Sequence, residues 1–147
     1  MGRITTNRHK GLDIMMHFQT VGQIPPKFWE GNFHYLRFHY QDTNLKRLNK
    51  IGGKTALLHI AMNIVAKKFR EGNPYFFVWL DVLNYKMLNI DKETFYEAAK
   101  LYIIINRRDY TLQLAMTKDT YPKLPSHRQA EIAQGLWIEQ KYDEYCL

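Results

Sequence analysis

The order of apolar and polar residues follows helical spacing over much of the chain. Residues 54–71 carry apolar side chains over most of a helical circumference, and Gly72 and Asn73 follow as a helix stop. A helix that is apolar on two flanks is packed on more than one side. We therefore predict a buried helix here. Its remaining narrow polar stripe consists of His59, Asn63, Lys67 and Arg70.

Further helices are expected on both sides of this segment. They follow from apolar residues at spacings of three and four, from prolines at first turns, and from N-caps at Asp91, Asp109 and Ser126. The predicted helices cover residues 6–20, 26–41, 74–89, 92–106, 110–117 and 126–141. No alternating segments flank a hairpin turn. The sequence therefore predicts an all-α fold of six or seven helices in stacked antiparallel helical hairpins.

The length and composition of the chain predict a single folded domain. Its 147 residues are enough for one hydrophobic core, and 46% hydrophobic with 24% charged residues is ordinary for a globular protein. The longest apolar stretches, at 56–66 and 75–83, are too short to span a bilayer, so we expect a soluble chain. The compartment, the oligomeric state and whether residues 1–147 belong to a longer protein stay open.

Positive charge is concentrated in the first half. Residues 1–72 hold 12 Lys and Arg against 4 Asp and Glu, a balance of +8, whereas residues 73–147 have a balance of −1. A basic half is typical of a nucleic-acid face or of a solvated surface. The nucleic-acid alternative is a basic helical protein that binds through Lys46, Arg47, Lys50, Lys54 and Lys67.

The tetrapeptide Gly52-Gly53-Lys54-Thr55 looks like the end of a phosphate-binding loop. A complete loop needs a glycine five residues before the Gly-Lys pair, and Leu48 occupies that position. The loop must also follow a buried strand, and the preceding residues are too polar to form one. We therefore interpret this stretch as the entry to the 54–71 helix.

Other signs of catalysis or metal binding are also lacking in the sequence. No two of the six histidines are spaced i, i+4, as a helical metal site would require. The single cysteine, Cys146, allows neither an internal disulfide nor a thiolate cluster. We predict that the protein is not an enzyme, and we expect no cofactor or metal.

Residues 73–140 resemble a known family. The segments "FYEAAKLYIIINRRDYTLQLA" and "YPKLPSHRQAEIAQGLW" are similar to the C-terminal tetratricopeptide-like region of a family of uncharacterised Bacteroidetes proteins. The chain departs from the family pattern at Gln129-Ala130-Glu131, where Gln-Glu-Ala is more common. The resemblance implies a short tetratricopeptide-like solenoid, often carried behind transmembrane helices in a longer bacterial protein, and supplies no catalytic residues.

These observations favour a non-enzymatic module that binds a protein or peptide. Stacked hairpins present a concave surface on which extended or helical segments bind. The predicted partner-binding residues are the polar stripe of the 54–71 helix.

Overall fold

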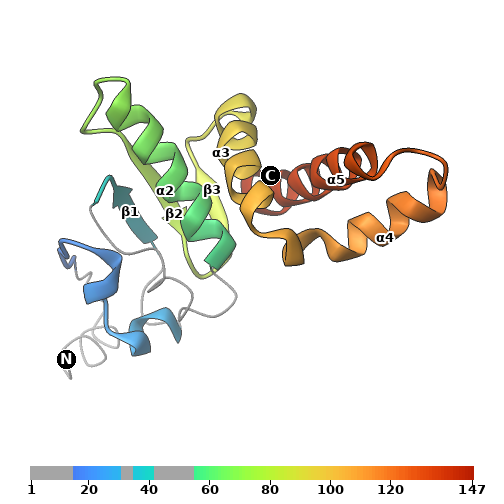
Figure 1. The fold of residues 1–147 in the computed structure, drawn as a ribbon. Coiled ribbons are helices and arrows are strands. Elements are labelled where there is room, and N and C mark those ends of the chain that lie inside the picture. The colour runs from blue at the N-terminus through green and yellow to red at the C-terminus, as the bar shows by residue number, and fades with distance from the viewer. Residues whose placement is uncertain (1–14, 31–34, 42–54) are drawn as a thin grey trace.

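The computed structural model describes residues 15–30, 35–41 and 55–147, and it has an α+β fold (Figure 1). The predicted all-α fold of six or seven helices in stacked helical hairpins is therefore wrong. The strands are β1 (Tyr35–His39), β2 (Phe77–Asp81) and β3 (Lys86–Leu88). The α-helices of the described residues are α2 (Thr55–Arg70), α3 (Lys92–Ile105), α4 (Thr111–Thr120) and α5 (Ser126–Cys146). Short 3-10 helices lie at η1 (Val21–Gln23), η2 (Pro26–Glu30) and η5 (Arg107–Tyr110).

The three strands form an antiparallel sheet in the order β1-β2-β3. Side chains of a strand alternate between the two faces of its sheet, so every second residue belongs to one face. Phe38, Val78 and Leu80 lie on the face toward α2, and each is at most 1% exposed. The sheet is therefore held by an apolar inner face that α2 covers.

The helix predicted at 74–89 is wrong, because this segment forms the β2–β3 hairpin. The turn is closed by Asp81, whose carboxylate accepts hydrogen bonds from the Asn84 backbone N–H at 3.1 Å and from Asn84 Nδ2 at 2.9 Å. Tyr85 follows with φ 57°, in the left-handed region. The apolar run that suggested a helix has apolar residues on both faces of a strand, which removes the usual alternation.

The helix predicted at 26–41 is also wrong. Among the described residues of this range, only η2 is helical, and Tyr35–His39 form the strand β1. Strand β1 pairs with β2, with Tyr35 opposite Asp81 and His39 opposite Phe77. Of the helix predicted at 6–20, residues 15–20 are not helical and the rest lies outside the described residues.

Helices α2 and α3 confirm the sequence prediction almost to the residue. Gly72 ends α2 with φ 91°, and the Asn73 N–H bonds back to the Lys68 carbonyl at 2.9 Å. Asp91 caps α3 as expected, because its carboxylate accepts the Thr94 N–H at 3.2 Å. Both ends are therefore set by local side-chain and backbone chemistry.

Helices α4 and α5 were predicted with the wrong caps. Tyr110 and Pro125 precede them as N-cap residues, and neither supplies a side-chain cap. Asp109 instead accepts a hydrogen bond from the Tyr102 hydroxyl of α3. Helix α5 also continues to Cys146, five residues beyond the predicted end. In Figure 1, α2 lies over the sheet, α3 lies beside α2, and the α4–α5 pair projects away from the sheet.

Candidate functional site

Most of the polar stripe of α2 lies along α3 and contacts it. Asn63 Nδ2 donates a hydrogen bond to the Ala98 carbonyl at 3.1 Å, and Lys67 forms an ion pair with Glu97. The His59 ring lies edge-on to Tyr102 at 5.6 Å between centroids. Only Arg70, at the exposed end of the helix, has no α3 partner among the described residues. Three of the four predicted partner-binding side chains are thus engaged within the chain.

We expect Asn63→Ala to lower the free energy of unfolding by about 1 kcal/mol, because it removes the side-chain hydrogen bond that joins α2 to α3. Urea denaturation measures this change. Arg70→Ala, on the same stripe but exposed, is the control, and its effect should stay within about 0.5 kcal/mol. Equal losses for the two variants would contradict the assigned role of Asn63.

The basic residues of the nucleic-acid alternative are placed only in part. Lys46, Arg47, Lys50 and Lys54 lie outside the described residues. The hydrogen bond to Glu97 raises the pKa of Lys67. The Lys67 ammonium is therefore already paired with a carboxylate of α3. Among the described residues there is no group of three or more His, Cys, Asp or Glu that could hold a metal ion. Nor is any helix in these ranges long and apolar enough to cross a membrane.

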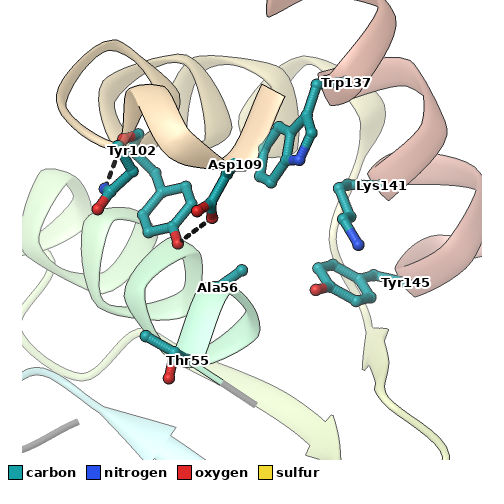
Figure 2. A pocket seen from close by; sticks show the side chains of 8 residues that line it. Thr55, Ala56, Tyr102, Asp109, Trp137, Lys141 and Tyr145 are labelled. Carbon is teal, nitrogen blue, oxygen red and sulfur yellow. Dashed lines mark hydrogen bonds between the residues drawn. The ribbon is translucent and has the colours of Figure 1, made fainter. Parts of the chain in front are cut away.

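A pocket of about 430 Å³ lies where α2, α3 and α5 meet (Figure 2). Figure 2 shows Tyr102 and Asp109 on one side of it, with Trp137, Lys141 and Tyr145 of α5 on the other. The remaining lining residues are Thr55, Ala56 and Asn106.

The polar groups of this pocket largely bind one another. The Tyr102 hydroxyl donates to Asp109 at 2.6 Å, and the Trp137 ring stacks on Tyr102 at 5.6 Å between centroids. The Lys141 ammonium lies 5.9 Å from the Trp137 ring centre and 5.5 Å from that of Tyr145. Burial raises the pKa of Tyr102, which the bond to Asp109 reinforces, and burial also raises the pKa of Tyr145. Both phenols stay protonated near neutral pH, so neither serves as a general base.

The interface between α4 and α5 has an inverted polarity. The buried residues of α4 are Gln113 and Thr117, whereas Leu112 and Met116 are 68% and 55% exposed. Gln113 Nε2 donates to Gln140 of α5 at 2.7 Å. Since apolar side chains normally turn inward, α4 presents to solvent the kind of surface that other helices bury.

A groove of about 500 Å³ runs along this helix pair, and we name it the α4–α5 groove. Its apolar lining is Ile104, Tyr110, Leu114 and Ala130. Its polar lining is Arg107, Lys118, Ser126, His127, Glu131 and Gln134. Among the described residues, neither Arg107 nor Lys118 forms an ion pair, while Glu131 pairs with Arg128 at 3.3 Å. The uncompensated charge at the groove is therefore positive.

Sequence reasoning missed this groove. Tyr110, Leu114 and Lys118 are spaced i, i+4, i+8 and so lie on one helical face, a signal that was present in the sequence. Without the position of α5, however, that face could not be identified as the wall of a groove.

No protein-family model, curated protein or solved structure matches this chain. The resemblance of residues 73–140 to the Bacteroidetes family therefore stays a prediction.

Proposed function

We propose that the protein is a non-enzymatic interaction module that binds a helical segment of a partner protein in the α4–α5 groove. The apolar lining of the groove, formed by Ile104, Tyr110, Leu114 and Ala130, carries this proposal. Grooves between helices commonly receive the apolar face of an amphipathic helix.

The lining of the groove indicates the chemistry of the bound segment. Tyr110 to Lys118 covers eight residue steps, or about 12 Å of helix axis, which matches slightly more than two helical turns of a ligand. Ile104 and Leu114 favour apolar side chains at helical spacing on that ligand. Arg107 and Lys118 favour a ligand with acidic residues on either side of its apolar residues, because opposite charges increase the association rate and orient the partner.

A displayed library of random amphipathic helical peptides tests this function. Selection on the wild-type protein should yield peptides with apolar residues at i, i+3 or i+4, and i+7, and with acidic flanks. We expect Ile104→Asp to lower the affinity for the selected peptides at least about tenfold, because it places a charge in the apolar lining. Fluorescence anisotropy with a labelled selected peptide measures the affinity.

The adjacent isoleucine is a matched control. Ile105 is 81% exposed and does not line the groove, so Ile105→Asp should leave the affinity within about twofold. Lys118→Glu should lower the affinity for acidic peptides, whereas Lys123→Glu, outside the groove, should leave it unchanged. Selected peptides that bind Ile104→Asp and wild type equally would refute the groove as the binding site.

A further inference from the structure

The face of the sheet opposite α2 is rich in aromatic residues. Because side chains alternate, the register places Tyr35, Arg37 and His39 of β1 on this face with Phe77 and Trp79 of β2. Leu88 of β3 lies opposite Trp79 and belongs to the same face. We call these residues the outer face of the sheet.

The aromatic rings of the outer face form one continuous group. The Tyr35 and Trp79 rings are stacked with their centroids 6.0 Å apart, and Phe77 meets Trp79 edge-on at 6.3 Å. The His39 ring lies 5.6 Å from Phe77. Solvent reaches this group, since Tyr35 is 55% exposed and Phe77 and Trp79 are only half-buried. A solvated sheet face ordinarily carries polar residues, so this composition calls for an explanation.

The charge on this face is positive. The Arg37 guanidinium lies 4.1 Å from the centre of the Phe77 ring and is exposed. Lys86, opposite Asp81 at the rim, donates a hydrogen bond to the Glu144 carbonyl at 2.7 Å. The Asp81 carboxylate is buried and is used by Asn84 in the hairpin turn. Burial and the nearby Arg37 lower the pKa of His39, so its ring is neutral at pH 7.

We propose that the outer face binds single-stranded RNA. Tyr35, Trp79 and Phe77 would stack on unpaired bases, and Arg37 and Lys86 would contact phosphates. Aromatic rings on an antiparallel sheet bind two or three consecutive bases in this way, and unpaired bases are what RNA loops and tails present. The basic balance of residues 1–72, in which β1 lies, favours the approach of a polyanion.

Cross-strand aromatic pairing alone would stabilise the sheet without any ligand. That explanation accounts for the contact between Tyr35 and Trp79. Arg37 lies over Phe77 on the same face, and an exposed guanidinium beside aromatic rings is also an arrangement that contacts a nucleotide's base and phosphate.

Fluorescence anisotropy with a labelled, unstructured RNA of about 12 nucleotides tests the proposal, with DNA of the same sequence as the comparison. We expect RNA binding that weakens steeply between about 50 and 200 mM salt. Tyr35→Ala and Trp79→Leu should each weaken it about tenfold or more, and Arg37→Ala should reduce the salt dependence by about one phosphate contact. Trp79→Leu retains an apolar side chain in the strand, so the sheet is preserved while the ring is lost.

Matched variants elsewhere on the protein test whether RNA binding depends on this face and not on other exposed residues. Tyr121→Ala removes an exposed tyrosine after α4, and Arg108→Ala removes an exposed arginine of η5. Both variants, and the groove variant Ile104→Asp, should bind RNA as wild type does. The proposal is overturned if RNA does not bind at low salt, if Tyr35→Ala and Trp79→Leu bind as wild type, or if DNA binds more tightly. It is also overturned if these variants change self-association in sedimentation and leave RNA affinity unchanged.

Discussion

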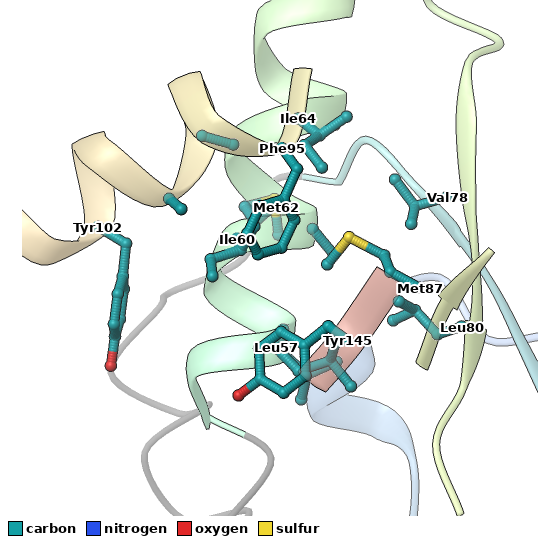
Figure 3. Packing of buried hydrophobic residues seen from close by; sticks show 14 of the residues in the cluster. Leu57, Ile60, Met62, Ile64, Val78, Leu80, Met87, Phe95, Tyr102 and Tyr145 are labelled. Carbon is teal, nitrogen blue, oxygen red and sulfur yellow. The ribbon is translucent and has the colours of Figure 1, made fainter. Parts of the chain in front are cut away.

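Phe95→Ala is expected to lower the free energy of unfolding by about 3–5 kcal/mol, the range for deleting a fully buried phenyl ring. Phe95 is 0% exposed, and its ring meets those of Tyr142 and Tyr145 at 5.6 and 6.4 Å between centroids. Figure 3 shows it beside Ile60 and Met62 of α2. Since these neighbours belong to α2 and α5 as well as α3, the cavity would lie where three helices meet.

Urea denaturation followed by circular dichroism measures this loss. Leu101→Ala, on the same helix but 51% exposed, is the control and should change stability by less than about 1 kcal/mol. Similar losses for both variants would contradict the view that α3 is held by its buried face.

The sequence identified those elements whose burial and ends are set locally. Residues 54–71 are apolar on two flanks because the sheet lies on one side of α2 and α3 lies on the other. The apolar pattern of the sequence therefore indicates both contacts. Asp91 and Gly72 act through hydrogen bonds to residues within five positions, so their effect can be read from the sequence.

The strands were missed because their stabilisation comes from distant residues. Tyr35 pairs with Asp81, and nothing in the local sequence of β1 indicates that partner. In β2, the inward residues Val78 and Leu80 alternate with Phe77 and Trp79, which are also apolar. The alternation of apolar and polar residues that marks a strand is then absent. The sequence shows a continuous apolar segment instead, and a segment of this length is also compatible with a helix.

The same reasoning explains why the groove and the outer face were not predicted. The side of α4 that is buried is set by its contact with α5, which includes the hydrogen bond between Gln113 and Gln140. On the sheet, Arg37 was part of no recognised motif, since its contact with Phe77 exists only after β1 and β2 pair. Both surfaces are products of tertiary contacts, whereas the predicted stripe on α2 was a local pattern, and three of its four residues form tertiary contacts with α3.

The stability of the fold is expected to fall steeply above pH 10, and Tyr102 and Tyr145 should cause much of this loss. Burial raises the pKa of both phenols above the ordinary value of 10.0. Above pH 10 the unfolded chain has released these protons while the native state retains them. The unfolded state then binds fewer protons, so the free energy of unfolding decreases as pH rises. Below pH 10 the contribution is fully present.

Each tyrosine can contribute a slope of up to about 1.4 kcal/mol per pH unit, or about 2.7 kcal/mol for the pair. Urea titrations from about one pH unit below to about 1.5 units above an ordinary phenol pKa measure it. Burial also raises the pKa of Cys146 to about 11, which acts in the same direction. All variants should therefore carry Cys146→Ser. The double variant Tyr102→Phe, Tyr145→Phe should lose most of the slope, because phenylalanine has no proton to release.

Exposed tyrosines provide the control for this pH dependence. Tyr75 is 83% exposed and Tyr121 is 49% exposed, so replacing both with phenylalanine should leave the alkaline slope unchanged. Tyrosinate absorbance gives a second measurement, in which the signal of Tyr102 and Tyr145 should appear only as the protein unfolds. An unchanged slope in the Tyr102→Phe, Tyr145→Phe variant would mean that these phenols ionise in the native state. The contact of Tyr102 with Asp109 would then have to open without unfolding, and the joint between α3 and α5 would be looser than its packing indicates.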